Sequence, residues 1–511
     1  MTVEHVLMLD IDGLRADVLE TALKTGRAPN LALLLGGAEL PHGLLHPLLA
    51  PAPSITFASQ ASLFTGAHPA WHGIPGNQFF DRFGTSSEGR PRHYAFDVGD
   101  TLAADDAVSV FTHGLAAERL LADTVYEAAA ERGRRSLVAA HMYARGATRW
   151  LHPSLLNLAR FTKGGNLFGL ESAEYDRYTL DTTLKAITQE GLPHLLTVYF
   201  MGLDHESHHH GPGAQLDYLS GVLDRYVGEL WQAVQKALPP GDRGPLCLIF
   251  SDHGQIGVPA DDRHSLRLGF PFEREMGHLF DALGLDVHDF PGEDPDCDAV
   301  VASNGGLAHV YLQNRKGRWR DAPNFERDVL PVAQAFWEAH ATGAYAAELH
   351  GALAGVLVRD VEHESWSTVY QALTPQGDRV PLAEWFAAQP GELYADPVNR
   401  LNNLAGSLDY LSKINEEGYN LVQFNKDLIH YFRRVLALKF APELETHFAR
   451  ELTDQELALV KKHSQMIQPE KTIELIKSLI EAYTEMRYSP FAIVPLEVAI
   501  IENLKDTDKH G

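Results

Sequence analysis

Five acidic and histidine residues lie in three short groups along the sequence, and each group follows an apolar, β-rich segment. The five residues are Asp12, Asp204, His208, Asp252 and His253. Aspartate and histidine together are ligands typical of zinc, with manganese or iron as alternatives. Carboxylates crowded into one crevice would repel each other, whereas bound cations would hold them ionised and close together. Each acid alone could equally cap a helix, but the three groups together indicate a divalent metal site.

The segment 53–66, Pro-Ser-Ile-Thr-Phe-Ala-Ser-Gln-Ala-Ser-Leu-Phe-Thr-Gly, supplies a candidate nucleophile, Thr56. A hydroxyl at the start of a helix meets the positive end of the helix dipole, and a coordinating metal lowers its pKa further, so it could attack as an alkoxide. Backbone N–H groups at a helix start also suit a phosphate. Without the acidic groups, an ordinary threonine cap would be the better interpretation of Thr56.

Parallel strands are the elements that can bring these groups together. The apolar runs 6–11, 195–201 and 246–250 are separated by longer helical or loop segments, a spacing that suits a parallel sheet with crossover helices. In an open α/β sheet the carboxyl ends of the strands share one edge, where ligands bind. The sequence therefore predicts an α/β body with its metal site at that edge.

Amino-acid usage changes abruptly near Ser407. Before this residue there are 25 Arg and 5 Lys, whereas the tail has 4 Arg, 9 Lys and only two of the 42 glycines. A glycine-poor tail favours helices, and its apolar residues recur at helical three- and four-residue steps. These residues are Leu421, Phe424, Leu428, Phe432, Val435 and Leu436. We therefore predict domains at 1–406 and 407–511, the second of them all-α.

The overall composition argues against several partners. The 511 residues are 45% hydrophobic and 22% charged, as in ordinary globular proteins. The net charge of −25 disfavours nucleic acid and anionic membrane, since both would be repelled. Cys247 and Cys297 are too few for a disulfide framework. No stretch reaches transmembrane length, and the N-terminus runs straight into an apolar strand. We therefore expect a cytoplasmic protein without membrane contact.

Four motifs, in this order, resemble those of the alkaline phosphatase superfamily and most closely its type I phosphodiesterase/nucleotide pyrophosphatase branch. They are Asp12-Gly13-Leu14-Arg15-Ala16-Asp17, the Thr56 segment with its Thr-Gly-x-x-Pro-x-x-His-Gly-Ile continuation at 65–74, Asp204-x-x-x-His208-x-x-Gly211-Pro212, and Asp252-His253-Gly254. The resemblance implies an alkaline-phosphatase-like, mostly parallel sheet flanked by helices. It also implies two divalent ions, with Zn²⁺ preferred. One would be held by Asp12, Thr56, Asp252 and His253, and the other by Asp204 and His208.

The same resemblance implies a metal-dependent hydrolase of phosphodiesters or nucleotide pyrophosphates, acting on a small phosphorylated substrate such as a nucleotide. Thr56 would form a covalent phospho-threonine intermediate that water then hydrolyses. Asn77 falls where the family often places an asparagine, which makes it a candidate substrate contact. Many relatives have Pro-Asn after the Thr-Phe pair, where this chain has Ala58-Ser59, so Ser59 is the candidate replacement donor.

The second metal of the family normally takes a further histidine from a His-Gly pair late in the domain. His309 and His350 are the available histidines, and we prefer structural roles for both. The stretch 394–401 looks like the lead-in to the missing segment, and the junction at Ser407 follows directly. We therefore hypothesise that the body stops short of its last ligand, which would leave the second site incomplete and impair the enzyme.

Three more histidines surround the second pair of candidate ligands. They are His205, His209 and His210. Their spacing does not match the family motif, so we expect them to be solvated or to lie behind the ligands, where they could modulate metal affinity.

The tail from about Ser407 resembles the helical collar domain of the bacterial DNA polymerase III gamma/tau subunit, in segments 418–439 and 488–497. In that family the domain holds clamp-loader subunits together, so the resemblance suggests self-association through the C-terminal helices. The family's ATPase module is absent here, and so is the P-loop pattern Gly-x4-Gly-Lys-Ser/Thr. An impaired body carried on an oligomerisation module is therefore one alternative function, and the junction could mark a fusion.

A second alternative stays within the enzyme class. A phosphomonoesterase or phosphonate hydrolase could use the same metal arrangement. A monoester carries more charge and usually needs an extra Arg or Lys donor in the site. Arg15 and Arg82 are available by sequence.

Overall fold

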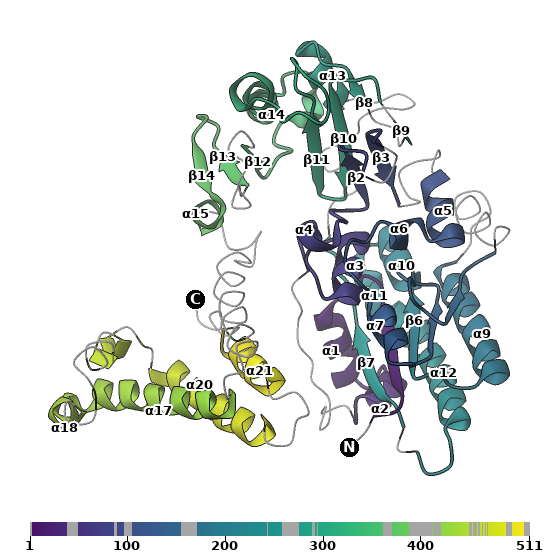
Figure 1. Cartoon of the computed structure of the whole chain (residues 1–511), viewed down its shortest axis with the longest axis vertical. Coiled ribbons are helices and arrows are strands. Elements are labelled where there is room, and N and C mark those ends of the chain that lie inside the picture. Colours follow the sequence, from purple (N-terminus) through teal and green to yellow (C-terminus); the bar gives the residue numbers. More distant parts are fainter. Residues whose placement is uncertain are drawn as a thin grey trace. The chain divides into compact units, whose positions relative to one another are not determined.

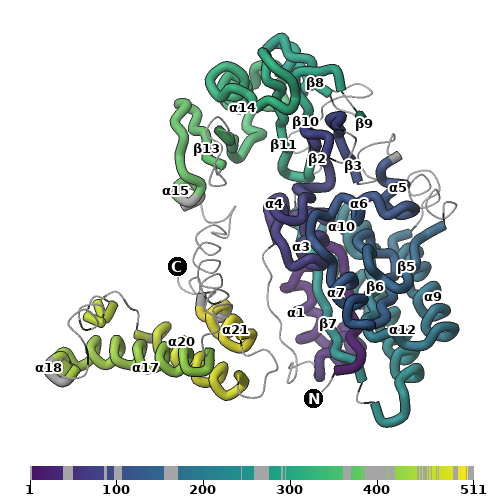
Figure 2. The backbone as a smooth tube through the Cα atoms, viewed as in Figure 1, coloured from purple at the N-terminus to yellow at the C-terminus, as the bar shows by residue number. Residues whose placement is uncertain are grey.

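The computed structural model describes residues 3–37, 50–85, 89–96, 105–154, 171–242, 244–257, 275–288, 292–293, 295–360, 370–387, 411, 421–448, 469–486 and 493–504, with short runs between 452 and 467. The chain forms two compact units, which Figure 1 and Figure 2 display by sequence colour. The first contains Met1–Val369 and Leu373–Asp378, and the second contains Tyr370–Ala372 and Arg379–Gly511.

A five-stranded parallel sheet organises the first unit. Its order is β5-β4-β6-β1-β7. The strands are β1 (Val6–Ile11), β4 (Ser136–Ala139), β5 (Arg149–Leu151), β6 (Leu195–Phe200) and β7 (Leu246–Phe250). Because β1 pairs in parallel with both β6 and β7, the three strands that precede the candidate ligands are direct neighbours and end at one edge.

Helices cover both faces of this sheet (Figure 1). Side chains alternate between the faces of a strand, so Leu7, Leu9 and Ile11 pack on one side and Met8 on the other. The first face is buried by α1 (Ala16–Lys24), α2 (Pro29–Leu34), α9 (Ser172–Glu190) and α12 (Asp224–Ala237). The second is buried by α3 (Thr56–Thr65) and α7 (Val125–Glu131). Burial on both faces explains why β1 and β6 read as nearly continuous apolar runs.

The chain turns directly from β6 into α10 (Gly202–His210), followed by a 3-10 turn at Pro212–Ala214, α11 (Gln215–Tyr218) and a π-helical turn at Leu219–Leu223. Asp176 of α9 fixes this turn, because its carboxylate accepts the N–H of Gly202 and the hydroxyl of Tyr218, each at 2.9 Å. A Cβ on Gly202 would lie 2.2 Å from the Tyr218 hydroxyl oxygen. Glycine is therefore required for this close approach at the start of α10.

Two further small sheets lie within the first unit. One has the order β2-β3-β9 and the other β11-β10-β8. Asn304 links them, since its amide accepts the N–H of Gln78 at 3.1 Å and donates to the Gln78 carbonyl at 3.0 Å. The strands are β2 (Gln78–Asp81), β3 (Arg92–Ala95), β8 (Val287–His288), β9 (Gly292–Glu293), β10 (Ala299–Asn304) and β11 (Leu307–Leu312). The helices of this part are α4 (Pro69–His72), α5 (Asp105–His113), α6 (Leu115–Glu118), α13 (Glu275–Ala282) and α14 (Leu330–Thr342).

The described part of the second unit is mostly helical. Its helices are α15 (Leu382–Ala387), α17 (Leu421–Phe440), α18 (Glu445–Phe448), α20 (Pro469–Met486) and α21 (Ile493–Leu504). Leu421, Phe424, Leu428 and Phe432 of α17 pack against α20 and α21, as their spacing predicts. Short strands β12 (Val356–Val358), β13 (Gln371–Leu373) and β14 (Arg379–Pro381) precede these helices in sequence.

The predicted fold class is confirmed: a parallel sheet flanked by helices, and a helical C-terminal region. Strands β1 and β7 match the apolar runs from which they were predicted, and β6 ends one residue before its predicted end. None of the helices in the described segments is both long and apolar enough to cross a membrane. The predicted junction at Ser407 and the stretch 394–401 lie outside the described residues, so the predicted domain limits stay predictions.

Candidate metal centre

Asp12 follows β1 and is buried at the edge of the sheet. Its two carboxylate oxygens have different surroundings. Oδ2 accepts a short hydrogen bond from the hydroxyl of Tyr199, which lies on the neighbouring strand β6. Oδ1 is buried and makes no hydrogen bond to a described residue. Asp12 therefore offers one oxygen to a ligand while the other is held by the protein.

Asp252 follows β7 and repeats this arrangement. Its Oδ1 accepts the backbone N–H groups of Gly13, at 3.2 Å, and His253, at 2.9 Å. Its Oδ2 is buried and has no hydrogen-bond partner among the described residues. His253 keeps its own ring in place through Nδ1, which lies 3.1 Å from the carbonyl oxygen of Gly254. A carbonyl only accepts, so Nδ1 carries the proton and Nε2 presents a lone pair.

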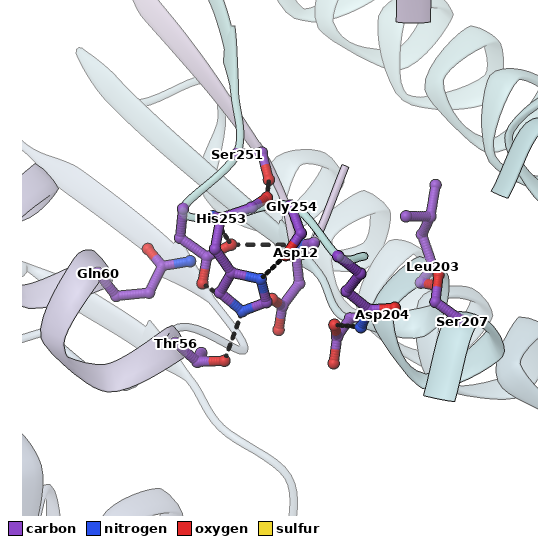
Figure 3. A network of polar contacts seen from close by, with 12 residues as sticks. Asp12, Thr56, Gln60, Leu203, Asp204, Ser207, Ser251, His253 and Gly254 are labelled. Carbon is purple, nitrogen blue, oxygen red and sulfur yellow. Dashed lines mark hydrogen bonds and ion pairs between the residues drawn. The ribbon is translucent and has the colours of Figure 1, made fainter. Parts of the chain in front are cut away.

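Thr56 is the first residue of α3, and its side chain reaches this group (Figure 3). Its Oγ1 lies 3.1 Å from His253 Nε2. The same nitrogen is 3.4 Å from Asp12 Oδ1 and 3.5 Å from Asp252 Oδ2. The structure thus brings together all four residues predicted for the first metal.

The atoms that converge here are nearly all acceptors. Asp12, Asp252 and His253 each offer a ligand atom, all within 4.8 Å of one another. Two carboxylate oxygens and one nitrogen lone pair therefore lie close together. The Thr56 hydroxyl can donate its single proton to His253 Nε2. Buried acceptors without donors are costly unless a cation satisfies them. Oxygen and imidazole nitrogen at this spacing fit a divalent ion such as zinc.

The electrostatics of the metal-free group agree with this fit. Burial raises the pKa of Asp12 well above its ordinary value, and the charges of Asp252 and Asp204 raise it further. Burial also raises the pKa of Asp252. Burial thus shifts both acids toward protonation, whereas a bound cation favours the carboxylates.

Asp204 and His208 form a separate pair on α10, beside the first group. Asp204 Oδ2 is 3.2 Å from His208 Nε2, and Oδ1 accepts a short hydrogen bond from the side-chain amide of Gln255. Burial works to raise the pKa of Asp204, but the hydrogen bond with His208, the charges of His208 and His253 and the hydrogen bond from Gln255 together outweigh it and lower the pKa. Gly13 allows the close approach, because it has φ of +69° and a Cβ there would lie 2.7 Å from Asp204 Oδ1.

The two residues predicted to bind substrate have different surroundings. Asn77 Oδ1 accepts the N–H of Phe57 at 3.0 Å, so its side chain lies beside the residue that follows Thr56. Ser59 is buried within α3, and its hydroxyl has no hydrogen-bond partner among the described residues. Both assignments stay predictions.

The match to known families now adds to this geometry. Residues 6–385 match the family model described as type I phosphodiesterase/nucleotide pyrophosphatase, which is well over half of the chain. The chain belongs to this phosphodiesterase family. Residues 400–507 are similar to domain III of the DNA polymerase III subunits gamma and tau. No curated protein matches the chain.

Several solved structures resemble part of the chain at low identity. Phosphonoacetate hydrolase from Sinorhizobium meliloti 1021, in complex with phosphonoformate, is 18% identical over 49% of this chain and 57% of its own, with a TM-score of 0.31. Human ectonucleotide pyrophosphatase/phosphodiesterase 5 is 15% identical over 66% of this chain and 70% of its own, with a TM-score of 0.40. An inactive variant of the murine protein in complex with AMP is 15% identical over 49% and 57%, with a TM-score of 0.33.

Around the phosphodiesterase motifs, the structure adds residues that the sequence analysis missed. The segment after β4 holds α3 at two points: His141 Nε2 lies 3.0 Å from Gln60 Oε1, and the Tyr143 hydroxyl donates to the Phe57 carbonyl at 2.9 Å. Asp10 is buried below this contact, with Oδ2 3.5 Å from His141 Nε2. Asp10 lies two residues before Asp12, so strand alternation could have placed it on the same face. The partners of Tyr199 and His141 depend on strand order, which the sequence does not state.

Among the remaining candidates, Arg15 lies beside the segment that follows His253, since a Cβ on Gly254 would be 3.2 Å from its Cγ. His309 Nε2 is 3.3 Å from the Pro75 carbonyl oxygen, and His350 is exposed at the end of a 3-10 turn. Arg15 pairs with Asp17 at 2.7 Å. Arg82 donates to the carbonyl oxygens of Trp319 and Asp321, each at 2.7 Å.

Proposed function

We propose that this chain hydrolyses phosphodiesters or nucleotide pyrophosphates, with Thr56 as the nucleophile and a phospho-threonine intermediate. The observation that carries the proposal is the position of Thr56 Oγ1 at a helix start, 3.1 Å from His253 Nε2 and beside the free oxygens of Asp12 and Asp252. Membership of the phosphodiesterase family supports the same reaction class. A nucleotide is the substrate that we favour.

The reaction proceeds in two displacements. Thr56 Oγ1 loses its proton to solvent and attacks phosphorus, and the bond from phosphorus to the leaving oxygen breaks, with the electron pair going to that oxygen. Water then attacks the phospho-threonine and releases a proton to solvent. The bond from phosphorus to Oγ1 breaks with its electron pair on Oγ1, which takes up a proton and restores the threonine. Bound divalent cations would lower the pKa of the attacking hydroxyl and neutralise charge on the phosphoryl group.

Residues of this chain also supply donors for the phosphoryl oxygens. Thr56 is the first residue of α3, and N–H groups at a helix start favour phosphate. The Nδ2 group of Asn77 is next to them, and its carbonyl oxygen is already fixed by the Phe57 N–H. This supports Asn77 as a substrate contact that is oriented before substrate arrives.

We propose two divalent ions, preferably Zn²⁺, with unequal affinity. Asp12, Asp252 and His253 are the one group of three or more closely spaced acidic, histidine or cysteine ligands within the described segments. Asp204 and His208 contribute two further ligands, and the stretch 394–401, which resembles the lead-in to the missing third ligand, lies outside those segments. The first site should therefore bind its ion more tightly than the second.

A phosphodiester is favoured over a phosphomonoester. The monoester needs an additional cationic donor, and both arginines considered for that role have other partners, Asp17 for Arg15 and two backbone carbonyls for Arg82. No observation favours the impaired-body alternative over the enzyme. For the tail, the gamma/tau-like match supports self-association as a proposal.

The test compares hydrolysis of a nitrophenyl phosphodiester by the native chain and by Thr56→Ala, with metal content measured by elemental analysis. Thr56→Ala should lose at least about a thousandfold in kcat, as expected when a nucleophile is removed, while retaining metal through the three remaining ligands. Thr65→Ala is the matched control, because it makes the same change at the other end of α3. Full activity of Thr56→Ala, or absence of activity in the metal-loaded native chain, would contradict the proposal.

A further inference from the structure

Helix α10 carries three pairs of polar side chains, each spaced by four residues. Asp204 pairs with His208 and Glu206 pairs with His210, at 3.2 Å and 3.0 Å. The third pair, His205 and His209, lies on the stripe between them, with ring centroids 4.3 Å apart. Residues four apart lie on the same side of a helix, so the histidine pair projects from a different stripe than the candidate catalytic pair.

Hydrogen bonds determine which nitrogen of His205 carries the proton. The Ser172 hydroxyl donates to Glu206 Oε2 at 2.7 Å, and a hydroxyl has a single proton to donate. His205 Nδ1 lies 2.9 Å from the same hydroxyl oxygen. Because the serine proton is already committed to Glu206, Nδ1 of His205 must be the donor. Its Nε2 is therefore left with a lone pair.

His209 reaches the same state by a different contact. Its Nδ1 lies 2.9 Å from the carbonyl oxygen of His205, which can only accept, so Nδ1 again carries the proton. His209 is exposed and His205 is half-buried. Two adjacent imidazoles therefore present Nε2 lone pairs while oxygen atoms anchor their Nδ1–H groups. This is the state in which histidine binds metals, with one nitrogen ligating and the other held by an oxygen.

We propose that His205 and His209 bind a late first-row divalent ion, such as Ni²⁺, Cu²⁺ or Zn²⁺, through their Nε2 atoms. Imidazole favours these ions, whereas Mg²⁺ and Ca²⁺ favour oxygen. Water would complete the coordination. His210 is not part of the site, because it projects from the next stripe of the helix, where its Nδ1 lies 3.0 Å from Glu206 Oε1. The proposal does not depend on the proposed hydrolase activity, since neither histidine belongs to the catalytic group.

The test is equilibrium dialysis of the full chain, with its tightly bound metals in place, against buffered Ni²⁺ followed by elemental analysis. Nickel is distinguishable from zinc that is already bound. The native chain should take up one additional Ni²⁺. His209→Gln should weaken this uptake by about tenfold or more, the least expected from disturbing a metal-bound histidine. Because His209 is exposed, the variant is expected to fold, and circular dichroism checks this.

Two matched variants separate the pair from its neighbours. His210→Gln and His208→Gln each remove an exposed imidazole from the same helix, and both should retain the additional Ni²⁺. If His209→Gln binds Ni²⁺ like the native chain, the proposal is overturned. If His210→Gln weakens uptake equally, the run of histidines binds the ion without a defined pair. If His208→Gln weakens uptake equally, the ion lies at the Asp204 and His208 pair. Each of these last two results would also overturn the proposal.

Discussion

At the scale of single residues, Tyr199 controls how Asp12 can act as a ligand. Its hydroxyl holds Oδ2 of Asp12 and leaves Oδ1 to face His253. A carboxylate fixed in this way presents one oxygen in a single direction. Less conformational entropy of the side chain is therefore lost when a metal binds. Residues that hydrogen-bond to metal ligands commonly affect the affinity for the metal in this way.

Tyr199→Phe should therefore weaken metal binding at the first site by about 10- to 100-fold without unfolding the chain. Competition with a chromophoric chelator measures the affinity directly and does not depend on turnover. Tyr126→Phe is the matched control, because Tyr126 is also a buried tyrosine with one side-chain hydrogen bond, to Thr197 at 2.8 Å. Equal metal affinity in Tyr199→Phe and the control would contradict the role of Tyr199.

His253 has one lone pair for two possible tasks. Nε2 can accept the proton of Thr56, at 3.1 Å, or it can bind a metal ion, but a single lone pair cannot do both. The acceptors contributed by Asp12 and Asp252 favour the metal, because they leave Nε2 among groups that a cation would satisfy.

Complete removal of metal by a chelator should accordingly abolish hydrolysis of the phosphodiester, and added Zn²⁺ should restore it. The measurement is initial rate against bound metal per chain. Hydrolysis that persists at zero bound metal would mean that His253 acts as a general base for Thr56 instead.

At the scale of elements, the turn from β6 into α10 depends on a buried acid. Burial raises the pKa of Asp176 from 3.8 to about 7. The folded chain therefore holds a proton that the unfolded chain releases. This contribution to stability is complete below the unfolded pKa of 3.8 and is lost as pH rises through the folded pKa of about 7.

Across this window Asp176 should lower the free energy of unfolding by up to about 1.4 kcal/mol per pH unit. Asp176→Asn keeps the shape of the side chain but cannot titrate, so its unfolding free energy should depend less on pH. Urea unfolding of both proteins at several pH values between 3.8 and 7 tests this. Parallel curves for the two proteins would rule out the contribution of Asp176.

The sequence was sufficient for the elements that end in candidate ligands. Apolar runs predicted β1 and β7 with their observed bounds. For β1 the reason is burial on both faces, which requires apolar residues at nearly every position, whereas β7 is an edge strand that leaves Leu246 and Leu248 exposed. The grouping of Asp12, Asp252 and His253 followed from the shared edge of a parallel sheet.

The sequence was not sufficient for the contacts between neighbouring elements. Gln255 holds Asp204, and Gln60 contacts His141, a residue 81 positions later in the sequence. Such pairs depend on strand order and on how α3 lies against the sheet, and neither has a local signal. That these side chains are polar does not predict which residues they contact.

At the scale of the whole molecule, the described residues show two kinds of architecture. The phosphodiesterase part contains the parallel sheet, and the tail contains helices whose apolar faces pack on each other. Within the tail, Ile473 and Ile480 of α20 remain exposed, by 38% and 49%. They lie seven residues apart and thus on one side of the helix.

If the tail self-associates, this side of α20 is where a charge should interfere. Ile480→Lys should shift the full chain to a smaller assembly in sedimentation velocity, while the rate of phosphodiester hydrolysis per chain stays unchanged. Glu481→Lys places lysine at the neighbouring exposed position and should leave the assembly intact. A native chain that sediments as a monomer at all concentrations would contradict self-association.

The central place of β1 has a consequence for how metal binding would be observed. β1 is hydrogen-bonded on both sides, to β6 and to β7, so the ligands that follow these strands separate when the sheet itself opens. Local fraying at the ends of the strands should therefore not release the bound ion. Bound metal should raise the free energy of this opening by its full binding free energy, and amide hydrogen exchange across the whole sheet should slow accordingly. Exchange rates in the middle of β1 would therefore report the metal affinity.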